Sequence, residues 1–186
     1  LSVFLYFIIE SIFIASLTNL VVLLHLIFFL VSTLFLQYLS IHDLLYFEIP
    51  IKGVISFLYV VVGFNICVAA VKLITSAQTY SLGNIDNILT ALLLGGIFFL
   101  VVKITKEKGM GSGDILMMFA VGLSLGISRG LTAYLITLLL ASIFGIILGL
   151  FQKRFHGLII PLVPFISLGF LIAAALPANF LLIFFF

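Results

Sequence analysis

Apolar residues fill most of the chain, and polar residues gather in a few short stretches between them. The first apolar run covers residues 2–41 almost throughout. A membrane-spanning helix needs about 20 apolar residues, so this run is too long for one span. Thr18 and Asn19 are the polar pair inside it, and we place a break there. The pattern then predicts an all-α bundle of seven transmembrane helices, over about 2–17, 20–43, 52–74, 88–104, 114–127, 130–151 and 158–176.

Three polar stretches predict the main loops. They are "EIPIKG" (48–53), where Pro50 disfavours helix at the residue before it, "TSAQTYSLGNIDN" (75–87) and "KEKGMGSG" (106–113). The helix over 114–127 is short, because roughly 14 residues cover about 21 Å of a hydrocarbon core about 30 Å thick. Either the bilayer thins there, or the glycine-rich loop enters the membrane zone, lined by protein or water.

Composition agrees with a membrane protein of one domain. The 186 residues are 65% hydrophobic and only 8% charged, whereas soluble domains are about 25% charged. A soluble domain of this size could not bury so much apolar surface. The net charge of +2 gives no indication of nucleic-acid binding. The single cysteine, Cys67, excludes an internal disulfide and a cysteine-rich zinc site.

Basic residues predict how the bundle is oriented, because cytoplasmic loops carry an excess of Lys and Arg. If the second helix ends in the cytoplasm, Lys72 and Arg129 lie on the outer side. The inner side then holds the other six basic residues: Lys52, Lys103, Lys106, Lys108, Lys153 and Arg154. This bias places the loop after the second helix and the loop before the fifth on the same, cytoplasmic face.

Two acidic residues mark the ends of helices on that face. Asp43 ends the second helix in "SIHDLLYFEIP", and Asp114 begins the fifth in "GMGSGD". An ionisable residue near the bilayer is costly and indicates a functional site. Two carboxyl groups that meet can share a proton, because both cannot ionise a few ångströms apart. One then acts as an acid while the other activates water, which is the chemistry of aspartic proteases.

The glycines before Asp114 fit that interpretation. Gly111 and Gly113, with Ser112 between them, leave the backbone open to close approach by an extended peptide. Simpler interpretations exist. Asp114 could be only the N-cap of its helix, a role that aspartate fills well, and Asp43 could be an interfacial residue facing water.

The order and spacing of these residues also resemble the motifs of a known family. Asp43 is followed, after five residues, by Ile49 and Pro50, and Asp114 closes a Gly-x-Gly-Asp motif. This arrangement resembles the type IV prepilin peptidases and preflagellin peptidases, which are intramembrane aspartic proteases of the GxGD type. The closing segment "IIPLVPFISLGFLIAAAL" (159–176) is similar to the family's Pro-x-x-Pro-Phe-x-x-x-Gly pattern. The resemblance covers about residues 38–176.

The chain departs from the family pattern at some positions. Leu116 stands where a lysine is common, and Ile51 where an asparagine follows Ile-Pro. The loop with paired Cys-x-x-Cys motifs, which larger members link to N-methylation, has no counterpart here. The chain therefore resembles the compact form that has only the peptidase.

The resemblance implies a membrane aspartic endopeptidase with Asp43 and Asp114 as its catalytic residues. It implies prepilin-like or pseudopilin substrates cut at the cytoplasmic face of the inner membrane, and neither a metal nor an organic cofactor. We expect Gly111, Ser112 and Gly113 to form the active-site loop. Glu48 and Pro50 are candidate substrate contacts, Glu48 for a basic leader. Two alternatives stay open: a small transporter that uses both aspartates as a proton or cation relay, and an inactive scaffold.

Overall fold

The structure, a computed structural model, describes residues 2–74, 83–105, 111–153 and 160–176. Every regular element in these ranges is a helix, so the predicted all-α class is confirmed. The helices are α1 (Ser2–Tyr46), α2 (Ile51–Ile74), α3 (Gly83–Thr105), α4 (Ser112–Gln152) and α5 (Val163–Ala175). Residues 75–82 of the predicted loop 75–87 and residues 106–110 of the predicted loop 106–113 lie outside the described residues, as do residues 177–186.

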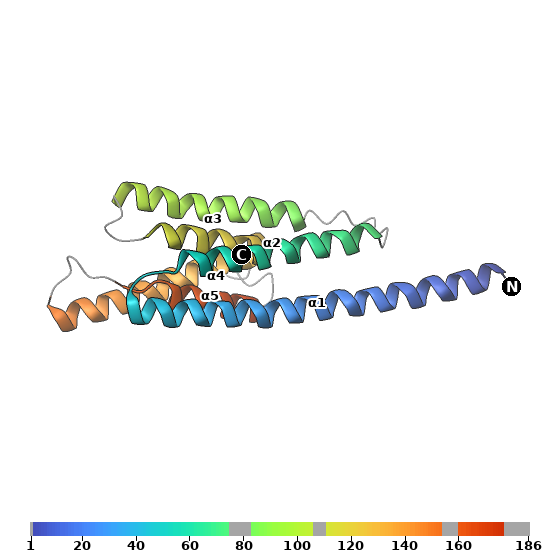
Figure 1. The fold of residues 1–186 in the computed structure, drawn as a ribbon, viewed down its shortest axis with the longest axis horizontal. Helices are drawn as coiled ribbons and strands as arrows, with labels where there is room; N and C mark the ends of the chain where they lie inside the picture. The colour runs from blue at the N-terminus through green and yellow to red at the C-terminus, as the bar shows by residue number, and fades with distance from the viewer. Residues whose placement is uncertain (1, 75–82, 106–110, 154–159, 177–186) are drawn as a thin grey trace, which may run out of the picture.

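Helix α1 is one continuous helix of 45 residues. The predicted break at Thr18 and Asn19 is wrong, because helical backbone continues through both residues. No glycine or proline occurs between residues 2 and 46, and Thr and Asn inside a helix cost less than about 1 kcal/mol each. The two predicted segments therefore form one rod, whose N-terminal part extends beyond the other described helices (Figure 1).

Helix α4 bends sharply at Gly126. The backbone there has φ 70° and ψ −177°, a conformation that glycine adopts most easily. A Cβ on Gly130 would lie 3.8 Å from Cα of Gly122, so the chain folds back on itself after the bend. The two arms, before and after Gly126, correspond to the segments predicted over 114–127 and 130–151.

Two predicted helix starts need correction. α3 begins at Gly83, so residues 83–87 of the predicted loop are helical, with Asp86 in the first turn, where an acidic side chain suits the helix dipole. α5 begins at Val163 rather than at 158. Pro161 explains the later start, because it disfavours helix at the residue before it, whereas Pro164 lies in the first turn of α5, where proline is tolerated.

Small residues let the helices pack closely. A Cβ on Gly122 of α4 would lie 2.8 Å from Cα of Ala91 in α3, and one on Gly169 of α5 would lie 2.6 Å from the carbonyl oxygen of Ala133 in α4. Such contacts are typical of helices that pack within a membrane. Between the helices lies an apolar core whose largest fully buried side chains include Phe57, Phe98, Phe170, Leu36 and Leu39.

In the described part of the chain, four helices are long and apolar enough to cross a bilayer, over Val22–Tyr46, Ile51–Val71, Ile85–Thr105 and Ser112–Gln152. Many large hydrophobic side chains on the outside of the bundle are exposed, as a lipid-facing surface requires. The protein is therefore a multi-pass integral membrane protein. The helices run up and down, so that α1 and α3 end, and α2, α4 and α5 begin, at one end of the bundle (Figure 1). We call it the aspartate end, because Asp43 and Asp114 lie there.

Candidate active site

Asp43 lies in the last turn of α1 and is buried, with 5% of its surface exposed. Its Oδ2 accepts a hydrogen bond of 3.0 Å from the backbone N–H of Val163, the first residue of α5. The first N–H groups of a helix have no partner within the helix and attract anions. Asp43 thus serves as an acceptor for the start of α5, 120 residues further along the chain.

The turn after Asp43 is held by local hydrogen bonds. Phe47 has φ 53°, and its N–H donates to the carbonyl oxygen of Asp43 over 2.9 Å. His42 Nδ1 lies 2.8 Å from the carbonyl oxygen of Glu48. Pro50 then precedes α2 and accepts hydrogen bonds from two N–H groups of its first turn, those of Gly53 and Val54. These contacts fix the direction in which the chain leaves the carboxyl group of Asp43.

Asp114 is the third residue of α4, and Gly111 is the N-cap. Asp114 Oδ2 accepts a hydrogen bond of 3.0 Å from the N–H of Gly111. The side chain therefore reaches back to the start of its own helix, but as the third residue and not as the N-cap itself. Its other oxygen, Oδ1, is buried and has no hydrogen-bond partner among the described residues. Capping thus accounts for only one of the two oxygens.

The turn after α1 touches the start of α4. A Cβ on Gly113 would lie 3.1 Å from both Cβ and Cδ1 of Ile49, so only a residue without a side chain fits beneath this isoleucine without displacing it. Asp114 directly follows Gly113. The Asp114 carboxyl group is buried, with 6% of the residue's surface exposed. The structure therefore places the two predicted aspartates at the same end of the bundle, both buried, with the turn after Asp43 in contact with the start of the helix that carries Asp114.

The remaining predicted site residues lie around this pair. Gly111 and Ser112 are exposed while Gly113 is buried, Glu48 is exposed, and Pro50 is partly buried. All lie at the aspartate end, and their roles towards a substrate stay predictions. Within the described ranges, no group of three or more His, Cys, Asp or Glu side chains could hold a metal ion.

The sequence interpretation did not identify the N–H of Val163 as a partner of Asp43. A backbone donor carries no signature of its own in a sequence. Pro164 gave an indirect signal, because proline is common in the first turn of a helix, and Pro164 does occupy the first turn of α5. A helix start placed there would have put unpaired N–H groups at the aspartate end.

The fold and the site together define a multi-pass membrane protein with two buried carboxyl groups at one end of a helix bundle. The model of the type IV leader peptidase family matches residues 27–150, about two thirds of the chain. The chain belongs to this family and is a protease. The matched region contains both Asp43 and Asp114 and ends within α4, before Val163. No match was found among curated proteins, and none among solved structures.

Proposed function

We propose that this protein is an aspartic endopeptidase that removes leader peptides from prepilin-like or pseudopilin substrates at the cytoplasmic face of the inner membrane. Asp43 and Asp114 are the catalytic pair. Membership of a peptidase family supports proteolysis rather than a transporter in which the two aspartates relay protons or cations. The observation that carries the assignment to these two residues is their placement: both are buried at the same end of the bundle, where Ile49, after α1, contacts Gly113, next to Asp114.

The hydrogen bonds of the pair support this chemistry. One oxygen of each carboxyl group is held by a backbone N–H, from Val163 for Asp43 and from Gly111 for Asp114. Asp114 Oδ1 is left as a buried acceptor without a partner among the described residues, and such atoms usually bind a water molecule. In the proposed mechanism one carboxylate takes a proton from this water, whose oxygen attacks the scissile carbonyl carbon. The other, protonated carboxyl group donates to the carbonyl oxygen.

The substrate is proposed to approach along the small residues before Asp114. Gly111 and Ser112 are exposed beside the buried carboxyl groups, so an extended backbone meets little steric hindrance there. Exposed Glu48 is available to the basic residues of a leader, as the sequence suggested. The apolar helix that follows the leader would then remain in the bilayer beside the bundle.

The proposal is tested by cleavage of a purified prepilin-like substrate with a basic leader and a following apolar helix. Wild type is compared with Asp114→Asn and with Asp86→Asn, a matched control. Asp86 lies in the first turn of α3, at the end of the bundle opposite to the pair (Figure 1). We expect cleavage by wild type and by the control, and none by Asp114→Asn. Full cleavage by Asp114→Asn would refute the assignment.

A further inference from the structure

A second feature of the bundle lies at the end opposite to the aspartates. A cavity of about 390 Å³ opens there between α1, α2, α4 and α5, with one side chain of α3. His25 of α1 lines it, and Asp43 follows eighteen positions later in the same helix. This corresponds to about 27 Å, close to the roughly 30 Å of a hydrocarbon core. The cavity therefore lies near the surface of the leaflet opposite to the proposed active site.

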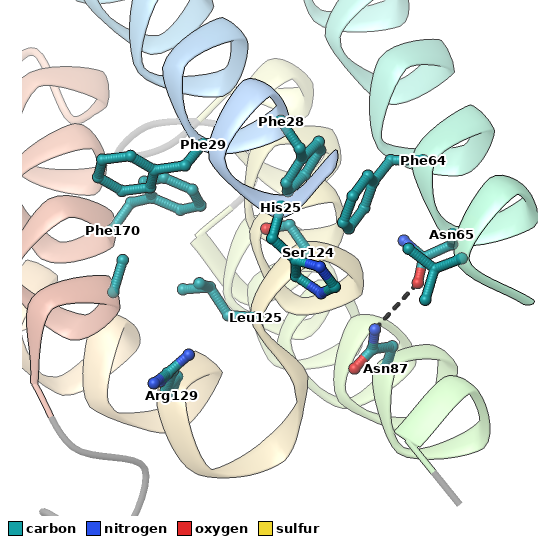
Figure 2. Close-up of a pocket in the computed structure, with 12 residues that line it drawn as sticks. His25, Phe28, Phe29, Phe64, Asn65, Asn87, Ser124, Leu125, Arg129 and Phe170 are labelled. Atoms are coloured by element: carbon teal, nitrogen blue, oxygen red, sulfur yellow. Dashed lines mark hydrogen bonds between the residues drawn. The ribbon is translucent and has the colours of Figure 1, made fainter. Parts of the chain in front are cut away.

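One side of the cavity is aromatic. Phe28 of α1 stacks on Phe64 of α2 with ring centroids 3.9 Å apart, and Phe29 of α1 stacks on Phe170 of α5 at 6.2 Å. His25 packs edge-on against Phe64. Figure 2 shows these rings on the upper side of the cavity and Arg129 below them. The cavity thus has an apolar wall facing a charged group.

The amide side chains in the cavity are already engaged in holding the fold. Asn87 Nδ2 donates to Asn65 Oδ1 over 2.9 Å, and Asn65 Nδ2 donates to the carbonyl oxygens of Val61 and Leu123. Asn87 Oδ1 packs against Gly126, where a Cβ would lie 2.6 Å away. These donors fasten α2 and α3 to the bend in α4, so they are not the groups that would bind a ligand.

Arg129 is different from the amides. It follows the bend in α4 and is exposed, and its guanidinium forms no hydrogen bond or ion pair with any described residue. None of the described residues that line the cavity is acidic, so the guanidinium is the one permanent charge among them. Near the surface of a leaflet, an arginine side chain reaches the level of the lipid headgroups. A guanidinium presents parallel N–H donors that fit two oxygens of a phosphate or carboxylate.

We propose that this cavity binds an anionic phospholipid of the leaflet opposite to the aspartate end, with its phosphate on Arg129. The volume suits a headgroup and the first part of the acyl chains. The aromatic wall continues into exposed apolar residues of α1, among them Leu26 and Phe29, along which the chains can lie. The depth, the single cation and the apolar wall together favour a lipid over a free anion.

The test measures lipid binding by native mass spectrometry of the detergent-purified protein. The first molecule of phosphatidylglycerol should bind at least about tenfold more tightly than phosphatidylcholine, because a charge-assisted pair is lost with the neutral lipid. Arg129→Gln should abolish this preference, and Arg129→Lys should reduce it. Lys103→Gln removes the same charge from an exposed position at the aspartate end and should retain the preference. An unchanged preference in Arg129→Gln would overturn the proposal.

A second measurement needs no variant. The chain has two arginines, Arg129 and Arg154, so an arginine-specific reagent such as phenylglyoxal reports on both in wild type. Phosphatidylglycerol should slow modification of Arg129 relative to Arg154, and phosphatidylcholine should not. Equal protection by inorganic phosphate alone would overturn the assignment to a lipid. Lipid binding is independent of cleavage, so Asp114→Asn should bind phosphatidylglycerol like wild type even though it is expected to be inactive.

Discussion

The N–H of Val163 donates a hydrogen bond of 3.0 Å to Oδ2 of Asp43. This one contact ties the start of α5 to the end of α1 across 120 residues of sequence. It also orients a buried carboxyl group that local sequence places only at a helix end. The hydrogen bond therefore both stabilises the bundle and positions a carboxyl group of the proposed active site. Mutation can separate these two roles.

Replacing Asp43 by alanine should destabilise the protein more than replacing it by asparagine. Alanine leaves the buried N–H of Val163 without an acceptor, which costs about 1–3 kcal/mol, whereas the amide oxygen of asparagine can still accept it. Thermal unfolding in detergent should show a lower midpoint for Asp43→Ala than for Asp43→Asn. Equal midpoints would mean that the contact does not contribute to stability.

Asp43→Asn and Asp114→Asn should each abolish leader cleavage, by about a thousandfold or more, while the protein remains folded. Asparagine preserves the size and the hydrogen-bond acceptor but cannot exchange a proton with water, as general acid–base catalysis requires. The double variant should be about as inactive as either single one, because the residues act as a unit. Rates are compared at matched membrane expression. If Asp114 were only a helix cap, Asp114→Asn would be nearly silent.

Cleavage by wild type should rise and then fall as pH increases. The proposed mechanism needs one carboxyl group protonated and the other ionised, so activity is lost at low pH, where both are protonated, and at high pH, where both are ionised. The two limbs of the profile of kcat/KM belong to the pair and not to either residue alone. A flat profile over the range in which the folded protein is stable would contradict acid–base work by these groups.

Gly113→Val should lower cleavage more strongly than Gly113→Ala. A side chain at this position meets Ile49 at 3.1 Å, and overpacking of this kind typically costs about 1–3 kcal/mol. Ile49→Ala should partly restore the activity of Gly113→Ala, because it vacates the space. Gly96→Ala is the control, since nothing lies within 4 Å of a Cβ there. A Gly113→Val variant with normal activity would show that the contact between the turn and α4 is unimportant.

Gly126→Ala should destabilise the bundle by about 1–2 kcal/mol or more. Its φ of 70° is unfavourable for alanine, and the new methyl group would lie 2.6 Å from Asn87 Oδ1. Gly63→Ala in α2 has open space around it and should be neutral or slightly stabilising, because alanine is the better helix former. Thermal unfolding of both variants in detergent gives the comparison. If Gly126→Ala were as stable as Gly63→Ala, the bend in α4 would not require glycine at position 126.

The sequence alone determined the membrane class, the helical content and the candidate catalytic pair. These follow from local properties: the length of apolar runs, the scarcity of charge, and aspartates placed where such runs begin or end. The bounds of α2 were predicted almost to the residue, because Pro50 marks its start. The bend in α4 was predicted as a gap between two segments, and Gly126 supplies the conformation that makes it possible.

Only the tertiary structure decided the contacts that assemble the site. Hydropathy suggested a break at Thr18 and Asn19, yet neither residue forbids a helix, and α1 continues through them. The bond from Val163 to Asp43 and the packing of Ile49 on Gly113 join segments far apart in the chain. The bond to Asp43 comes from a backbone N–H, which every non-proline residue carries. The packing of Ile49 depends on Gly113 having no side chain. Such contacts depend on how the helices pack, and for that reason local patterns cannot specify them.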